Sequence, residues 1–118
     1  MLENFRPGFS PQEIVCIDSS DLRLFAEVIQ LIPERARCWA KPLVLANYVE
    51  FQLELLHDLR ECSQLILPID LFRSALDTEV IPVMMDLFEL EKTPDRSATD
   101  LLLSRQALNH FVRSLEGV

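Results

Sequence analysis

The hydrophobic pattern of this chain changes at about Pro68, and this change is the strongest constraint on its fold. Before Pro68, apolar and polar residues alternate with period 2, most clearly in VEFQLELL, residues 49–56. Strands place alternate side chains on opposite faces, so this stretch indicates a strand with its glutamates on a solvated face. After Pro68, apolar residues recur at helical spacing. The order of the two patterns predicts an α+β fold.

About five apolar segments before Pro68 are predicted strands, separated by short turns or proline-containing connectors. Residues 22–32 form one of them. Pro42, in the next segment, indicates an edge strand or a bulge, because proline cannot donate a ladder hydrogen bond. Short connections between consecutive strands are typical of an antiparallel meander, which at this size we expect to curl into a small SH3-like or OB-like β-barrel. Two or three C-terminal helices are expected to follow.

The length of 118 residues predicts a single domain, 1–118. Within it we expect a lead-in over residues 1–13, a β meander over residues 14–68 and a helical part over residues 69–118. The lead-in contains two prolines and a glycine, which disfavour regular structure.

Proline also marks the first predicted helix. Pro82 is expected at its first position, which proline favours, and the helix is expected to run through Lys92. Asp77 and Glu79 just upstream are interpreted as its caps. A second helix is predicted from apolar residues at helical spacing near the end of the chain: Leu101, Leu108, Phe111, Val112 and Leu115.

The composition excludes several functions. The chain has only two glycines, Gly8 and Gly117, both near its ends, so neither a glycine-rich phosphate-binding loop nor a tight primed hairpin turn is expected in the interior. The net charge of −8 argues against nucleic acid and against an anionic membrane surface as partners. No apolar run reaches the about 20 residues of a membrane span, and the N-terminal residues lack the pattern of a signal peptide.

The cysteines indicate a cytoplasmic protein. Cys16, Cys38 and Cys62 are odd in number and form no C-x-x-C pair, so reduced thiols are expected rather than disulfides or a zinc site. His57 and Glu61 are four residues apart and could share a metal on a helix, but two ligands without a third at a recognised spacing do not define a metal site. We therefore predict no catalytic residue, no metal and no cofactor. The alternative is a small-molecule-binding or enzymatic domain, with its site in the barrel mouth near Cys38, His57 and Cys62.

RARCWAKPLVL, residues 35–45, is the first predicted partner-binding segment. It contains the single Trp of the chain, Trp39, and three neighbouring cations, Arg35, Arg37 and Lys41. Trp and Arg are enriched at interface hot spots. The alternative is that Trp39 packs over the barrel mouth while its neighbours stay solvated.

PVMMDLFELEK, residues 82–92, is the second such segment. Met84, Met85, Leu87 and Phe88 add to more apolar surface than one core-facing stripe requires, and methionine-rich surfaces suit adaptable recognition. Of these, Met84, Met85 and Phe88 are the predicted partner-binding residues. Two alternatives are that this helix plugs one end of the barrel or forms a homodimer contact. The two segments together predict a non-catalytic protein–protein interaction module that acts as an adaptor, an assembly factor or a regulator.

Two stretches, RCWAKPLVL (residues 37–45) and SQLILPIDLFRSALDTEVIPVM (residues 63–84), resemble sequences in small uncharacterised conserved proteins of cyanobacteria. The resemblance covers about half of the chain and carries over no catalytic residue. It implies a cytoplasmic bacterial setting and an accessory role near photosynthesis or carbon fixation.

Overall fold

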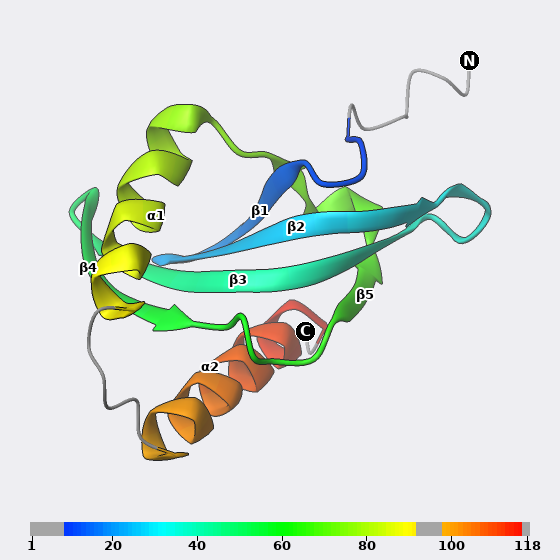
Figure 1. Cartoon of the computed structure of the whole chain (residues 1–118). Helices are drawn as coiled ribbons and strands as arrows, with labels where there is room; N and C mark the ends of the chain where they lie inside the picture. Colours follow the sequence, from blue (N-terminus) through cyan, green and yellow to red (C-terminus); the bar gives the residue numbers. More distant parts are fainter. Residues whose placement is uncertain (1–8, 92–97, 117–118) are drawn as a thin grey trace.

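A computed structural model describes residues 9–91 and 98–116, and it consists of an antiparallel sheet followed by two helices (Figure 1). The predicted α+β class is therefore confirmed. Residues 1–8, most of the predicted lead-in, lie outside the described residues. The elements are β1 (Ile14–Ser19), β2 (Leu22–Ile32), β3 (Arg37–Val49), β4 (Gln52–Asp58), β5 (Leu65–Pro68), β6 (Arg73–Ser74), α1 (Asp77–Glu91) and α2 (Ala98–Glu116).

The sheet has the strand order β4-β3-β2-β1-β6, and β5 also pairs with β3. The predicted meander is correct for β1 to β4, where consecutive strands are neighbours. β5 departs from it because β3 has 13 residues and offers two successive partners on one side. Its first residues pair with β5, as in Cys38 with Leu67, and its last residues pair with β4, as in Val44 with Asp58.

The sheet is not closed, so the predicted barrel is not confirmed, but the sheet must curve. Residues 69–72 connect β5 with β6, which lies at the opposite edge beyond β3, β2 and β1. In a flat sheet, the four interstrand spacings from β5 through β3, β2 and β1 to β6 would separate β5 from β6 by about 19 Å. The connecting chain reaches at most about 17 Å when extended, and part of it is the 3₁₀ turn Ile69–Leu71. Curvature therefore brings the two edges together at this end.

Both faces of the central strands are buried, each under one helix (Figure 1). On the α2 face, Leu108 and Phe111 of α2 belong to one buried cluster with strand residues such as Leu24 and Ala26. On the α1 face, Val83 of α1 joins a smaller cluster with the strand residues Cys16, Phe25, Val44 and Ala46. Burial on both sides explains why β1 reads as a continuous apolar run instead of an alternating one.

Pro42 occupies a bulge, as the sequence indicated. Ala26 of β2 pairs with Pro42 while the preceding Phe25 pairs with Val44, so Leu43 is an extra residue on β3. At this point the outer side of β3 faces the loop between β4 and β5, where the N–H of Leu59 donates to the carbonyl of Leu43. The missing N–H of Pro42 thus falls where the regular ladder is already interrupted.

Two boundaries differ from the sequence-based prediction at the β3–β4 hairpin. VEFQLELL is not one strand, because β3 ends at Val49 and β4 begins at Gln52. The two residues between them, Glu50 and Phe51, have φ of 52° and 68°. Positive φ at both central residues is what a type I′ turn requires, so a primed turn forms without glycine. Left-handed backbone costs roughly 1–2 kcal/mol per non-glycine residue, which the hairpin ladder must offset.

Helix α1 begins earlier than predicted, at Asp77, so Pro82 lies inside it. The carboxylate Oε1 of Glu79 accepts a hydrogen bond from the N–H of Leu76 at 2.8 Å, which is half of a capping box. This contact confirms the capping role of Glu79 and fixes a helical turn before the proline. Pro82 cannot donate to the carbonyl of Thr78, and both residues are exposed.

Candidate functional site

The outer face of α1 carries three large apolar side chains that are each more than half exposed. Ile81, Met85 and Phe88 are 56%, 61% and 58% exposed, respectively. Their spacings of four and three residues place them on one side of the helix. The buried side chains of α1 are Val83 and Leu87, on the opposite side. Met84 is partly buried between the two sides. Of the three residues predicted here for partner binding, Met85 and Phe88 therefore lie fully on the outer face.

A closed network of four charged side chains fixes the start of α1 to the sheet. Arg23 of β2 binds Asp18 at 2.7 Å and Glu79 at 3.0 Å. Arg73 of β6 binds the same two carboxylates at 2.7 and 2.8 Å. Each guanidinium thus bridges both carboxylates, and the charges of the four groups sum to zero. The network joins β1, β2 and β6 to the first turn of α1.

The network shifts the ionisation of its carboxylates. Partial burial raises the pKa of Asp18, but hydrogen bonds and charges from Arg73 and Arg23 outweigh it and lower that pKa below its ordinary value. Hydrogen bonds from Arg73 are the main reason that the pKa of Glu79 is lowered, against a smaller opposing effect of burial. Both carboxylates are therefore held in the charged form at neutral pH.

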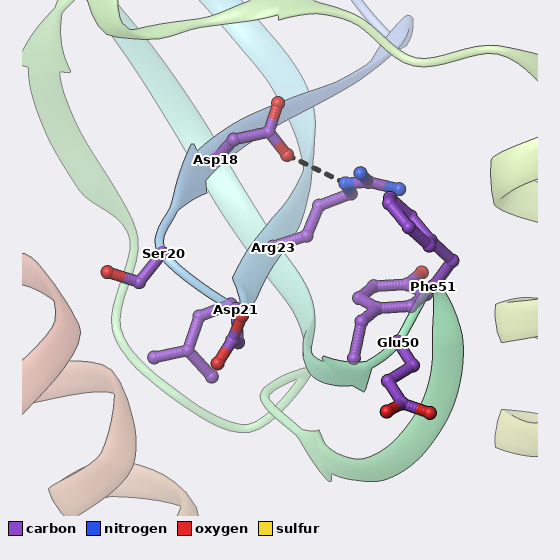
Figure 2. A pocket seen from close by; sticks show the side chains of 8 residues that line it. Asp18, Ser20, Asp21, Arg23, Glu50 and Phe51 are labelled. Atoms are coloured by element: carbon purple, nitrogen blue, oxygen red, sulfur yellow. Dashed lines mark hydrogen bonds and ion pairs between the residues drawn. The ribbon is translucent and has the colours of Figure 1, made fainter.

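A pocket of about 480 Å³ opens beside this network, between the β1–β2 turn and the β3–β4 turn (Figure 2). The guanidinium of Arg23 lies over the Tyr48 ring, 4.8 Å from its centre. Phe51, at the tip of the second turn, is fully exposed. The two turns are held together by a hydrogen bond from the N–H of Tyr48 to the carbonyl of Asp21, 2.8 Å long. The lining residues are Asp18, Ser20, Asp21, Leu22, Arg23, Tyr48, Glu50 and Phe51.

A second hollow, of about 280 Å³, connects this pocket with α1. Arg23, Tyr48 and Phe51 line both of them, and Thr78 and Pro82 of α1 line the second one. Figure 1 shows the β3–β4 hairpin next to α1 at the same end of the sheet. The exposed ring of Phe51 and the outer face of α1 therefore border one continuous region of surface.

The Trp39 segment lies on the same side of the sheet but farther along it. Cys38 and Ala40 face α2, so Trp39 and Lys41 point to the α1 face by strand alternation. Trp39 and Lys41 are partly buried, whereas Arg37 in β3 and Arg35 in the turn before it are exposed. Trp39 is five residues from Val44, where the cluster under α1 begins, or roughly 15 Å along the strand. The two predicted partner-binding segments thus share a face without merging into one patch.

Trp39 is also tied to its own sheet. Its indole N–H donates to the Oε1 of Gln64 at 2.9 Å, and Ile66, its partner in β5, is 55% exposed. The polar end of the indole is therefore satisfied within the chain, and an apolar neighbour remains open to solvent.

The cysteines and the histidine of the alternative site are distributed over three environments. Cys38 is fully buried on the α2 face, and burial raises the pKa of its thiol to about 11. Cys62 borders a hollow of about 170 Å³ next to α2, which neither Cys38 nor His57 lines. His57 is partly buried in β4, where desolvation lowers the pKa of its imidazole. In residues 9–91 and 98–116, no three His, Cys, Asp or Glu side chains converge in a way that could hold a metal ion.

Sequence reasoning did not identify the charge network or the exposed turn. Asp18 and Arg23 flank the turn cluster SSD, which is a local signal that could have suggested their pairing. Arg73 offers no such signal, because it reaches Asp18 across 55 positions of sequence. Phe51 was missed because its period-2 position looked like the interior of a strand.

Within the described ranges, no helix combines the length and the apolar character that crossing a membrane requires. Comparisons of the chain with models of protein families, with curated proteins and with solved structures gave no match.

Proposed function

We propose that this chain is a non-catalytic protein-interaction module that acts as an adaptor, an assembly factor or a regulator. The observation that carries the proposal is the outer face of α1, on which Ile81, Met85 and Phe88 are each more than half exposed. Full burial of a large apolar side chain from water contributes about 1.5–3 kcal/mol, and each of these side chains still has more than half of its surface to bury. A complex with a partner that covers this face would be stabilised by this burial.

Phe51 extends the proposed contact surface beyond α1. Its ring is fully exposed on a two-residue turn, and it borders the hollow that reaches Thr78 and Pro82. Aromatic side chains in such positions supply much of the binding energy in many interfaces. The β-ladder holds the backbone of the turn in place, so covering the ring costs side-chain entropy but little backbone entropy.

The Trp39 segment is a second part of the same proposal. Arg35, Arg37 and Lys41 form a cationic margin on a chain with net charge −8, and Trp39 with the exposed Ile66 supplies an apolar centre. Because this segment and α1 share one side of the sheet, a partner of sufficient length could contact both.

A cytoplasmic setting belongs to the proposal, since Cys16, Cys38 and Cys62 are all free thiols. The interaction module is preferred to an enzymatic or small-molecule site near Cys38, His57 and Cys62, because the hollow beside Cys62 is lined by neither of the other two residues.

Affinity purification from a lysate of the source organism, followed by binding measurements with the purified partner, tests this function. Wild type is compared with the double variant Met85→Gln, Phe88→Gln and with Trp39→Ala. Leu102→Gln with Leu103→Gln on α2 is the matched control, since both leucines are also half exposed. We expect the α1 variant to weaken binding by about tenfold or more and the control to bind like wild type. Equal binding by all folded variants would refute the assignment of the surface.

A further inference from the structure

The charge around the exposed face of α1 restricts the kind of partner that can cover it; this inference rests on the proposed function. The helix contains no Lys and no Arg. Asp77 lies at its beginning and Asp86 beside Met85, both exposed. Its acidic residues are Asp77, Glu79, Asp86, Glu89 and Glu91.

The neighbouring pocket has the same sign. Asp18 is compensated within the four-membered network, whose charges sum to zero. Asp21 and Glu50 also line the pocket, and both are exposed. Figure 2 shows their carboxylates on the two turns that border the pocket. An anion entering here would meet these carboxylates, whereas a cation would be attracted to them and to the face of the Phe51 ring.

We propose that the outer face of α1 and the adjacent turn bind a cationic amphipathic helix of a partner protein. Its apolar side chains contact Ile81, Met85 and Phe88, and its Lys or Arg side chains reach Asp86 and the pocket beside Glu50. The apolar stripe from residue 81 to residue 88 is about 10 Å long, which corresponds to two turns of a facing helix. Its spacing of four and three residues forms the ridge that packs into the groove of another helix.

A second copy of this chain that docks through its own α1 fits the surface poorly. Two α1 helices facing each other would bring the same acidic margins together, and like charges across an interface are unfavourable. The exposed leucines of α2, Leu102 and Leu103, provide an internal contrast. They lie close to both Asp100 and Arg105, so no single sign of charge surrounds them.

Two synthetic peptides test the inference directly. Both are amphipathic helices with the same leucine face; one carries lysines on its polar face and the other glutamates. Fluorescence anisotropy with the full chain measures their affinities. We expect the lysine peptide to bind at least about tenfold more tightly than the glutamate peptide, and to lose affinity as salt is raised from about 50 to 300 mM.

Two charge-conserving variants and one charge-removing variant separate specific docking from general attraction to an acidic protein. Met85→Gln with Phe88→Gln is expected to weaken binding of the lysine peptide about tenfold, while Leu102→Gln with Leu103→Gln leaves it within about twofold. Glu50→Gln with Asp86→Asn is expected to weaken binding and to reduce its salt dependence. Circular dichroism verifies that each variant is folded.

The peptide measurements would overturn the inference in three cases. They are equal binding of the lysine peptide by all variants, equal binding of the two peptides, and no binding of either peptide. Self-association that is lost in the Met85→Gln, Phe88→Gln variant would instead identify a second copy as the occupant and would also overturn it. If a natural partner is lost with that variant but binds through a segment that is not cationic, the proposed function stands and only this inference fails.

Discussion

At Glu79, one carboxylate accepts hydrogen bonds from Arg73, contacts Arg23 and caps the first turn of α1. Replacing it by Gln removes the charge while keeping the size of the side chain. We expect Glu79→Gln to lower the free energy of unfolding by about 1–2 kcal/mol, because two partly exposed guanidinium groups lose a charged partner. Urea unfolding measures the change.

Glu54→Gln is the control for this substitution. Glu54 is exposed in β4, so its replacement should change the free energy of unfolding by less than about 0.5 kcal/mol. If both variants had the same stability as wild type, the network would be a surface feature without energetic consequence.

The same two carboxylates predict how stability depends on pH. The pKa values of Asp18 and Glu79 are lowered in the folded chain. A lowered folded pKa contributes stability above the unfolded pKa, which is about 3.9 for Asp and 4.3 for Glu, and this contribution is lost as pH falls below it. Wild type should therefore lose more stability than the double variant Asp18→Asn, Glu79→Gln between about pH 5 and pH 3. Parallel pH profiles from urea unfolding would contradict this expectation.

The β3–β4 hairpin shows at the level of the element where sequence patterns fail. Strand propensity and alternation predict strand here, but neither indicates where the chain reverses, because Glu50 and Phe51 carry none of the usual turn chemistry. Helix α1 shows a different error, because the helix itself was predicted but its start was placed too late. Pro82 suggested a helix start, yet the helix begins at Asp77, where Glu79 caps the N–H of Leu76 and forms ion pairs with Arg23 and Arg73. The outer residues Met85 and Phe88 were identified because an apolar excess is visible locally, whereas pairs such as Arg73 with Asp18 depend on the completed fold.

The positive φ of Phe51 gives a test of the turn. Phe51→Gly should raise the free energy of unfolding by about 1 kcal/mol, because glycine adopts this conformation without steric cost. Phe51→Ala removes the same ring but retains a Cβ, so it should give no comparable gain. Thermal or urea unfolding of the two variants separates relief of backbone strain from loss of the ring. Equal effects of the two substitutions would show that the left-handed backbone at Phe51 does not lower the free energy of unfolding.

Across the whole molecule, the two helices are attached to the sheet to different extents. Helix α2 places Ser104, Leu108 and Phe111 in the protein interior and packs on the larger cluster, which includes residues of β1, β2, β3 and β5. Helix α1 buries Val83 and Leu87, and its start is held by the charge network. Local opening occurs most readily where few apolar side chains are buried. We therefore expect α1, the helix with the proposed docking surface, to leave the sheet more easily than α2.

Native-state hydrogen exchange measures this difference. We expect amides in the second half of α1, after Pro82, to exchange through an opening that costs less free energy than global unfolding, while the central amides of α2, β2 and β3 exchange with the global free energy.

Val83→Ala should accelerate exchange in α1 more than in α2, because it removes the α1 side chain that packs into the sheet cluster under that helix. Binding of the lysine peptide should slow exchange in α1 by the factor that its affinity and concentration dictate. If the amides of α1 exchanged only through global unfolding, the helix would be an integral part of the core. Its exposed face would then be a rigid surface.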